Sequence, residues 1–204
     1  MRILLTGGTG FIGSHTAVEM AQNGHDIVIL DNYSNSDESV LGRLEKIIGK
    51  PVVFEEGDIR DYDRLHEVLQ KHRIEAVVHF AGLKAVGESC VMPIEYFDNN
   101  VAGTVTLLRA MKALNIKKLI FSSSATVYGV PQYLPLDENH PLSSTNPYGR
   151  TKLHIEEILR DVAASDPEWS IVCLRYFNPI GAHASGLIGE NPRGIPNNLL
   201  PYVA

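Results

Sequence analysis

A tyrosine and a lysine in the second half of the chain have the spacing of an acid–base pair. Tyr148 and Lys152 are four residues apart at the start of an expected helix, so their side chains share one face of it. A free phenol has a pKa of about 10, too high for a base at neutral pH, and a nearby ammonium group lowers that pKa by favouring the phenolate. Ser124 lies at the end of an apolar run, at the same edge of the expected sheet, where its hydroxyl could share a proton with a substrate oxygen and the phenol. The Tyr-x-x-x-Lys spacing alone is a common accident, so the hypothesis depends on these neighbours.

A glycine-rich segment near the N-terminus has the pattern of a dinucleotide-binding loop. It follows an apolar run directly and opens an amphipathic stretch, which is the strand-to-helix context that such a loop requires. Gly7 permits a tight turn, Gly10 lets the backbone approach a diphosphate, and Gly13 lets the helix pack close to the sheet. The first turn of the helix offers free N–H groups and a positive dipole end to an anion. The segment therefore predicts a dinucleotide site.

An aspartate is expected at the end of the second strand, where it could select the cofactor. Asp31 follows Gly13 by 18 residues, close to the spacing of about 20 at which a carboxylate reaches the hydroxyls of the adenosine ribose. The same carboxylate would repel a 2′-phosphate, so the sequence favours NAD over NADP. The alternative is a structural role, because Asp31 followed by Asn32 is also good turn chemistry.

Short apolar runs alternate with amphipathic stretches along most of the chain. The runs lack period-two alternation, as expected for strands that are covered on both faces. Strands linked by helices over short connections form right-handed crossovers, so this order predicts an α/β fold with a doubly wound parallel sheet of Rossmann type. Ligands bind at the carboxyl ends of such strands. The expected strands are 3–5, 27–30, 51–54, 76–80, 119–121 and 171–174, and the expected helices are 11–22, 40–48, 64–71, 94–114 and 147–163.

The chain divides into a long first part and a short last part of different composition. Residues 1–176 contain all the expected strands and form the predicted NAD-binding domain of Rossmann type. Residues 177–204 are rich in Gly, Pro and Asn and have weak periodicity. We expect here the beginning of a smaller C-terminal substrate-binding region, apparently truncated. The alternative is an ordinary surface tail.

Composition and charge argue against several classes of protein. The 18 Lys and Arg against 24 Asp and Glu give a net charge of -6, which disfavours nucleic acid as a general partner. No run of 18 apolar residues is present, so no membrane-spanning helix is predicted. The eight histidines have no metal-ligand spacing and no Cys/His cluster is present, so no metal site is predicted. Two cysteines are too few for a disulfide framework, and we interpret the chain as a cytoplasmic protein with reduced thiols.

Six short segments together carry a resemblance to a known family. They are residues 6–13, 80–86, 122–129, 148–152, 175–183 and 194–199. On these segments the chain resembles the extended short-chain dehydrogenase/reductases, and within them the UDP-glucose 4-epimerases. The glycine loop and the tyrosine–lysine segment mark only the superfamily, whereas the loop that contains Lys84 and the last two segments are more specific. The resemblance covers the whole chain but only the N-terminal part of the family's fold.

The resemblance implies an NAD-dependent isomerase that epimerises a UDP-hexose, UDP-galactose or UDP-glucose, at C4 through a transient 4-keto intermediate. It makes Tyr148 the base for the 4-hydroxyl proton, Ser124 the residue that orients this hydroxyl, and Lys152 the residue that binds the nicotinamide ribose and holds the phenolate. It suggests a homodimer through the helix that begins at Ile94. The implied NAD site consists of Tyr148 and Lys152 with Gly7, Gly10, Phe11, Ile12, Gly13, Asp31, Asn32, Asp58, Ile59, Phe80, Ala81, Gly82, Lys84, Asn99 and Tyr176. The implied contacts with the UDP-sugar come from Ser124, Tyr148, Phe177, Asn178, Asn198 and Leu199.

Two other functions stay open at this point. Nucleotide-sugar 4,6-dehydratases that resemble this chain have an acidic pair just after the strand-five hydroxyl, and here those positions are Ala125 and Thr126. The second is an NAD-binding module without turnover, because the substrate-binding region looks incomplete. We therefore expect this chain by itself to bind NAD but to bind UDP-sugars weakly.

Overall fold

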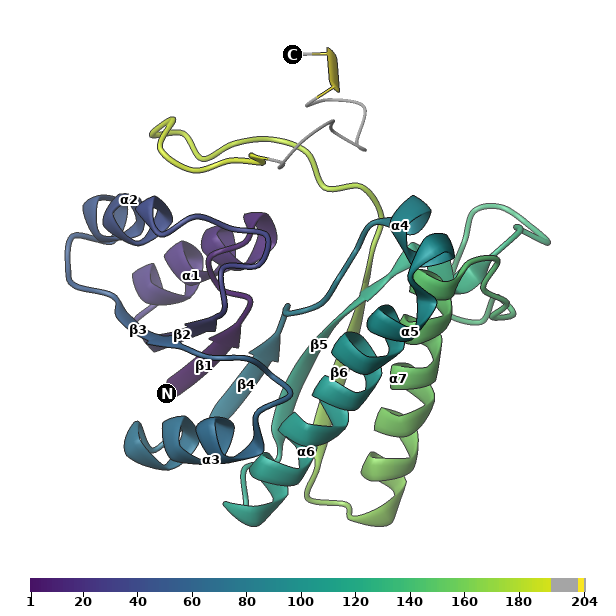
Figure 1. Cartoon of the computed structure of the whole chain (residues 1–204), viewed down its shortest axis with the longest axis horizontal. Coiled ribbons are helices and arrows are strands. Elements are labelled where there is room, and N and C mark those ends of the chain that lie inside the picture. The colour runs from purple at the N-terminus through teal and green to yellow at the C-terminus, as the bar shows by residue number, and fades with distance from the viewer. Residues whose placement is uncertain (192–201, 204) are drawn as a thin grey trace.

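The computed structural model describes residues 1–191 and 202–203, which contain one six-stranded sheet. Neighbouring strands are all parallel, in the order β3-β2-β1-β4-β5-β6 (Figure 1). The strand order reverses between β1 and β4, which makes this the switch point of a doubly wound sheet. The predicted α/β fold of Rossmann type is confirmed. The strands are β1 (Arg2–Thr6), β2 (Asp26–Asp31), β3 (Val53–Glu56), β4 (Ala76–His79), β5 (Lys118–Ser124) and β6 (Ser170–Tyr176).

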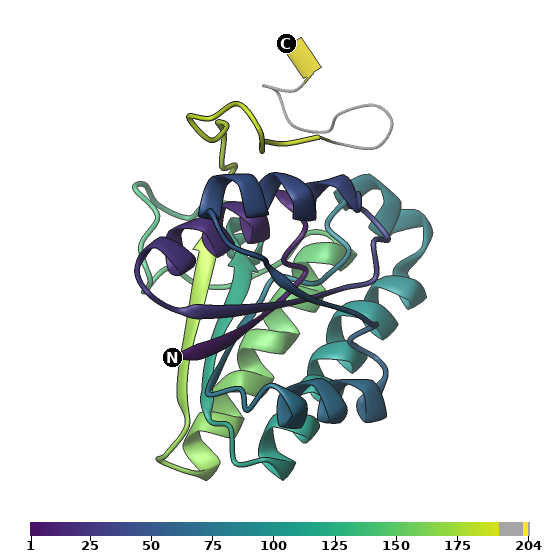
Figure 2. The ribbon, with the colours of Figure 1, turned by 90° about the vertical axis from the view of Figure 1, so that its left-hand side faces the viewer.

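Helices cover both faces of the sheet (Figures 1 and 2). One face packs against α1 (Phe11–Gln22) and α2 (Ser39–Ile48). The other packs against α3 (Tyr62–Lys71), α6 (Gly103–Ala113) and α7 (Pro147–Ser165). The shorter helical segments are α4 (Val86–Val91), α5 (Pro93–Tyr96), the π-helical η1 (Phe97–Ala102) and the 3-10 helix η2 (Ala125–Tyr128).

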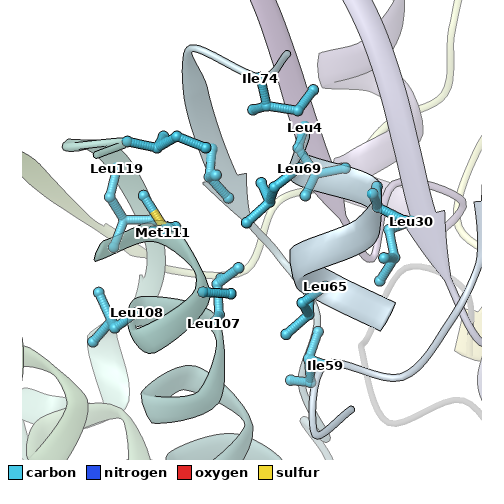
Figure 3. Close-up of a cluster of buried hydrophobic side chains, with 14 of the residues drawn as sticks. Leu4, Leu30, Ile59, Leu65, Leu69, Ile74, Leu107, Leu108, Met111 and Leu119 are labelled. Carbon is cyan, nitrogen blue, oxygen red and sulfur yellow. The ribbon is translucent and has the colours of Figure 1, made fainter. Parts of the chain in front are cut away.

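Two hydrophobic clusters, one on each face, hold these layers together. Leu4 of β1 packs in the cluster that contains Leu65 of α3 and Leu107 of α6 (Figure 3). The next residue, Leu5, belongs to the opposite cluster with Leu44 of α2. Successive side chains of a strand point to opposite faces, so a central strand that is covered on both sides must be apolar at every position. Full burial of each leucine stabilises the fold by about 1.5–3 kcal/mol.

Three differences from the sequence predictions affect the candidate site. The fifth strand continues to Ser124, so the serines belong to the strand instead of following it. The single helix expected over 94–114 is divided into α5, η1 and α6, because a π-helical turn at Phe97–Ala102 interrupts it. Such turns are rare and occur frequently at functional sites. The short helix α4 was not predicted at all.

Residues 177–191 return over the carboxyl edge of the sheet toward α1 and α2 (Figures 1 and 2). A bridge joins Ala182 to Gly189, and the N–H of His183 donates to the carbonyl of Ile188 at 3.0 Å. Ile188 is buried in the hydrophobic cluster on the α1–α2 face. The described beginning of the predicted C-terminal region therefore packs against the Rossmann-type fold. The predicted domain boundary after Tyr176 stays a prediction.

Within residues 1–191 and 202–203, no helix is both long and apolar enough to cross a membrane. In the same part of the chain, no group of three or more His, Cys, Asp or Glu side chains is placed to hold a metal ion.

Candidate active site

The glycine loop between β1 and α1 is built by close backbone contacts. Gly7 has a φ of +68°, a conformation that favours glycine. A Cβ at Gly7 would lie 2.6 Å from the backbone nitrogen of Ala81, and a Cβ at Gly13 would lie 2.4 Å from the carbonyl oxygen of Gly7. A Cβ at Gly10 would meet only that same oxygen, at 3.3 Å. Gly7 and Gly13 are therefore needed for packing, whereas Gly10 leaves space beside the loop for a ligand.

The N-terminus of α1 faces this loop and suits an anion. Gly10 is the N-cap residue, and its carbonyl accepts the first helical hydrogen bond from Ser14 at 2.8 Å. The N–H groups of the first turn, which include those of Phe11 and Ile12, have no partner within a helix and carry its positive dipole end. A diphosphate at this position would satisfy both features.

Asp31 lies at the end of β2 and contacts the glycine loop directly. Its carboxylate accepts a hydrogen bond from the N–H of Thr9 at 3.1 Å, and others from the N–H of Tyr33 at 3.0 Å and the hydroxyl of Ser36 at 3.3 Å. The turn role that the sequence left open is therefore present, and it ties the loop to β2. The predicted contact with a ribose stays a prediction.

The residues after β3 form a polar network beside Asp31. Asn32 donates to Asp58 at 3.1 Å, and the guanidinium of Arg60 donates to both carboxylate oxygens of Asp58 at 2.9 and 2.8 Å. These hydrogen bonds from Arg60 lower the pKa of Asp58 to about 2. Ile59 packs differently: its side chain is buried in the core against Gly103, where a Cβ would lie 2.6 Å from the Ile59 Cδ1 atom. Only the backbone of Ile59 is available to a cofactor.

The loop after β4 brings the glycine loop close to the lysine of the acid–base pair. The N–H of Ala81 donates to the carbonyl of Thr6 at 3.0 Å. A Cβ at Gly82 would lie 3.2 Å from Oδ1 of Asn100 and 3.7 Å from Nζ of Lys152. Lys84, further along the loop, has a side chain that is 55% exposed and pairs with Glu190 at 3.6 Å. The structure thus brings the two predicted sites together at the carboxyl edge of β1 and β4.

Asn100 is a central residue that the sequence analysis missed. Its side chain is buried in the π-helical turn, accepts a hydrogen bond from the N–H of Leu83 at 2.8 Å, and donates to the Leu83 carbonyl at 2.9 Å and the Thr151 hydroxyl at 3.1 Å. Asn99, which the resemblance named, donates to the Asn100 carboxamide at 2.9 Å. Asn100 therefore joins the cofactor loop to α7. Two adjacent asparagines inside an expected helix, where Asn is a poor helix former, were the available signal.

Helix α7 begins immediately before the candidate base. Pro147 occupies its first turn as predicted, and the side chain of the N-cap residue Asn146 accepts a hydrogen bond from the N–H of Gly149 at 2.8 Å. The N–H of Tyr148 donates to the buried hydroxyl of Ser89 at 3.1 Å, which anchors this turn to α4. The first turn of α7 is thus fixed by the Asn146 cap and by the contact with Ser89.

Lys152 is one turn further along α7 and is buried. Its side chain is 5% exposed, its Nζ donates to the carbonyl of Ser122 at 2.8 Å, and it lies 4.8 Å from the centre of the Phe121 ring and 6.0 Å from that of Tyr148. Burial lowers the pKa of Lys152 to about 8. The buried His79 packs against the same Phe121 ring. Burial, and to a smaller extent the charge of Lys152, lowers the pKa of His79 to about 3, so this histidine is neutral.

The electrostatics of Tyr148 correct one expectation. Burial raises the pKa of the Tyr148 phenol, and a hydrogen bond from Ser124 acts in the opposite direction. The expected lowering by Lys152 is therefore not the dominant effect in the ligand-free site. The physical reason is that loss of water disfavours the phenolate, and the ammonium group is directed to the Ser122 carbonyl.

The end of β6 lies beside Ser124 and leads to the predicted substrate contacts. Ser124 pairs in register with Tyr176, and its hydroxyl oxygen accepts hydrogen bonds from Thr126 N–H at 3.2 Å and the Thr126 hydroxyl at 3.0 Å. Phe177 is 63% exposed and stacks on Tyr128 with a centroid distance of 6.5 Å. Asn178 is exposed next to it. The other two predicted substrate residues, Asn198 and Leu199, lie outside the described residues.

Comparison with known proteins agrees with this geometry. Residues 3–204 match the NAD dependent epimerase/dehydratase family. The chain is 57% identical to UDP-glucose 4-epimerase from Bacillus subtilis over 204 residues, which are 100% of this chain and 60% of that protein. It is 54% identical to UDP-glucose 4-epimerase from Mus musculus over 210 aligned residues, again covering 100% of this chain and 60% of the relative. The chain thus spans about 60% of the length of these curated relatives.

Solved structures show the same likeness in three dimensions. UDP-glucose 4-epimerase from Bifidobacterium longum, in complex with NAD+ and UDP, superposes with a TM-score of 0.97 at 56% identity, covering 100% of this chain and 61% of that one. The enzyme from Stenotrophomonas maltophila, with bound NAD and formylated UDP-arabinopyranose, gives a TM-score of 0.97 at 51% identity and covers 100% of this chain and 60% of that one. By sequence and by fold, this chain belongs to the NAD-dependent epimerase/dehydratase family.

Proposed function

We propose that the protein containing this chain is an NAD-dependent isomerase that epimerises a UDP-hexose, UDP-galactose or UDP-glucose, at C4. The observation that carries the proposal is that Ser124, Tyr148 and Lys152 come together beside the glycine loop. Ala81 and Gly82 link the two, because Ala81 contacts Gly7 of the loop and Gly82 lies next to Lys152. Relatives that are 54–57% identical and named UDP-glucose 4-epimerase support the same reaction.

The residues present fit a dinucleotide. The open side of Gly10, the first turn of α1 and the carboxylate of Asp31 follow one another along the edge of β1 and β2. The buried ammonium of Lys152, which donates to a single backbone carbonyl, has hydrogens left for ribose hydroxyls. When bound, NAD supplies the hydride acceptor and donor for C4. The carboxylate of Asp31 favours NAD over NADP, because a 2′-phosphate would meet a negative charge.

The acid–base residues then have separate tasks. Tyr148 takes the proton of the sugar 4-hydroxyl as C4 is oxidised to the keto form, and returns it when C4 is reduced on the other face. Lys152 stabilises the phenolate, and Ser124 orients the 4-hydroxyl through a hydrogen bond. Positioning supplies much of the rate, because every reacting group stays bound throughout the cycle. In the ligand-free site Tyr148 is protonated at neutral pH, because burial raises its pKa. Added positive charge near the ring would favour the phenolate.

The substrate side of the proposal concerns the segment after β6. We assign contacts with the UDP-sugar to Phe177 and Asn178, which are exposed at the carboxyl edge next to Tyr176, and to Asn198 and Leu199. Residues of the complete protein outside this chain would supply further contacts. A cytoplasmic location and a boundary between an NAD-binding domain at 1–176 and a substrate-binding region from 177 onward belong to the same proposal.

A homodimer is the proposed assembly. The outer surface of α5, η1 and α6 is apolar, and Ile94 on it is 79% exposed. Asp98 and Arg109 are the charged residues among those that line it. Around a two-fold axis, the same apolar patch of each copy would face that of the other and be buried. Sedimentation of the complete protein, with Ile94→Glu as the disrupting variant, tests this assembly; a monomer before substitution would contradict it.

The reaction is tested by identifying the product of the complete protein. Incubation with UDP-galactose should give UDP-glucose until equilibrium is reached, without added cofactor if NAD stays bound after purification. A 4-keto-6-deoxy sugar as the product would instead show a dehydratase, a reaction that needs an acid close to the strand-five hydroxyl. Ala125 and Thr126, the first two residues of η2, occupy that place and carry no carboxyl group. Bound NAD without any conversion would show a binding module.

A further inference from the structure

An ion pair between a buried acid and a largely buried arginine joins three elements next to the candidate active site. Glu156 on α7 is 4% exposed. Its carboxylate accepts hydrogen bonds from the Arg175 guanidinium at 3.0 Å and 2.7 Å, and one from the hydroxyl of Ser123. Ser123 belongs to β5 and Arg175 to β6. We refer to Ser123, Glu156 and Arg175 as the buried joint.

Each member of the buried joint lies next to a residue of the proposed chemistry or one helical turn from it. Ser123 precedes Ser124 on β5, and Arg175 precedes Tyr176 on β6. Glu156 follows Lys152 by four residues and Tyr148 by eight on α7, so the three side chains lie along one face of the helix. The buried joint therefore connects the three elements whose relative position sets the geometry of the site.

The joint also extends toward the predicted substrate side. The guanidinium of Arg175 donates to the hydroxyl of Tyr128 at 3.2 Å and lies 4.9 Å from the centre of its ring. Tyr128 in turn stacks on Phe177. Hydrogen bonds to Glu156 come first among the causes that raise the pKa of Arg175, so this side chain stays charged. The same arginine thus touches the acid on α7 and the aromatic ring that stacks on Phe177.

Stability alone is a weak explanation for such a pair. Removing two charges from water is unfavourable, and well-packed apolar side chains of similar volume are often as stabilising as a buried ion pair. A bidentate arginine–carboxylate contact does supply geometric specificity, because both donors must meet both oxygens. Apolar side chains at this position would let α7 shift along its axis. The hydrogen bonds of Glu156 to Arg175 and Ser123 instead define the register of α7 against β5 and β6.

We propose that Glu156 and Arg175 are positioning residues, which hold Tyr148 and Lys152 in register with Ser124 on one side and Phe177 on the other. The catalytic meaning of this register rests on the proposed epimerase function. The register itself is a property of the fold and can be measured without a substrate.

The test uses substitutions that keep every charge and change only the geometry. Glu156→Asp shortens the acid by one methylene, and Arg175→Lys removes the fork while keeping the positive charge. The ionisation of the Tyr148 phenol is followed by ultraviolet difference titration of the complete NAD-loaded protein, comparing each protein with its own Tyr148→Phe counterpart. Because no charge has changed, a purely electrostatic effect predicts no shift. Lost register separates the phenolate from Lys152 and Ser124, so we expect the pKa of Tyr148 to rise in both variants.

Glu55→Asp is the matched control for this experiment. Glu55 is a second buried acid, on β3, and it accepts hydrogen bonds from Arg64 at 2.6 Å and Lys71 at 2.7 Å. It lies at the opposite edge of the sheet from β5 and β6. The same one-methylene change there should lower the melting temperature but leave the titration of Tyr148 unchanged.

A second measurement separates positioning from substrate affinity. For UDP-galactose we expect kcat to fall about 10- to 100-fold in Glu156→Asp, the size of effect that a misplacement of about 1 Å produces. KM should change much less, because the loss falls on an interaction made in the transition state. Ser123→Ala, which removes a single hydroxyl and preserves the fold, should shift both readouts in the same direction by smaller amounts. If Glu156→Asp and Arg175→Lys fail to fold, Ser123→Ala provides the test in their place.

The outcomes separate the two proposals. A shifted Tyr148 titration with reduced kcat supports the buried joint and the epimerase function together. A shifted titration in a protein that never converts UDP-galactose supports the positioning role and overturns the proposed function. A lower melting temperature with an unchanged Tyr148 titration, as expected for Glu55→Asp, would show that Glu156 and Arg175 only stabilise the fold.

Discussion

The glycine loop and the acid–base pair lie at the same edge of the sheet but are built in different ways. The glycine loop is formed by backbone atoms, and its requirement is steric: at Gly13 a single added carbon would lie 2.4 Å from a carbonyl oxygen. The acid–base pair is formed by side chains, and its requirement is electrostatic: Lys152 is buried with its pKa lowered to about 8. The first region needs particular residues to be small, whereas the second needs particular charges to be placed by distant partners.

This difference determines how each region responds to substitution. A steric requirement fails as soon as an atom is added, and the failure affects binding and folding together. An electrostatic requirement can be removed while the fold stays intact, or even becomes more stable, because burial of a charge opposes folding. The following substitutions test the contrast, in order of decreasing expected effect.

The largest effect is expected for Tyr148→Phe in the complete protein. The substitution removes one hydroxyl and keeps the ring, so packing and NAD binding should survive. A positioned acid–base group contributes about 10²–10⁴-fold in rate, so UDP-galactose turnover should fall by that factor. Tyr62→Phe at the start of α3, outside the acid–base pair, is the control for loss of a phenol hydroxyl. Near-normal turnover by Tyr148→Phe would show that another group acts as the base.

Gly13→Ala tests the steric side of the comparison. The new methyl group would lie against the Gly7 carbonyl and the Gly8 backbone, at 2.4 and 2.8 Å, and neither can move without opening the loop. We expect a loss of stability of about 1–3 kcal/mol and weaker NAD binding, measured by thermal unfolding and calorimetry. Gly42→Ala is the control, because no atom lies within 4 Å of a Cβ there and alanine favours helix by up to about 1 kcal/mol. Equal effects of the two substitutions would contradict the steric account.

Lys152→Met tests the electrostatic side through stability. The pKa of Lys152 is about 8 in the folded chain and about 10.4 in an unfolded one, so the unfolded state binds more protons between these pH values. Lys152 therefore opposes folding in full below pH 8, and this penalty disappears as the pH rises through about 10. The difference between the two pKa values corresponds to a destabilisation of about 3 kcal/mol. Removing the ammonium group recovers this free energy but loses about 1 kcal/mol from the hydrogen bond to Ser122.

The expected result is an inactive protein that is more stable by about 2 kcal/mol at pH 7 without cofactor. The gain should vanish toward pH 10, which thermal unfolding over a pH series would show. A Lys152→Met protein that is destabilised at all pH values would mean that the buried ammonium already has full compensation in the ligand-free fold.

The same contrast explains what the sequence could predict. The glycines, the apolar strands and Pro147 act through local geometry, so the fold, the loop and the start of α7 followed from residue type and spacing. Asn100 and Arg175 act through partners 17 to 51 residues and 19 to 47 residues away. Residue spacing contains no information about such contacts. For the same reason the predicted direction of the Tyr148 pKa shift was wrong. The sequence shows the neighbouring lysine, but it does not show how deeply the phenol is buried.

Asp31 combines a structural role in the glycine loop with a charge that is predicted to act on the cofactor, and its substitution is expected to have the smallest effect. Its carboxylate holds the glycine loop through Thr9 and is also the group predicted to select NAD. Asp31→Asn keeps an oxygen acceptor for the Thr9 N–H but removes the negative charge, so the loop should survive while the repulsion of a 2′-phosphate disappears. A hydrogen bond to a charged group contributes about 1.5–3 kcal/mol against about 1 kcal/mol for a neutral one, so NAD affinity should fall by about tenfold. NADP affinity should rise.

Calorimetry with both cofactors on the wild type and on Asp31→Asn tests this prediction. Asp31→Ala removes both the charge and the acceptor, so its NAD affinity should fall further. If the unaltered protein binds NAD and NADP equally well, Asp31 serves the loop alone and the proposed selectivity for NAD is wrong.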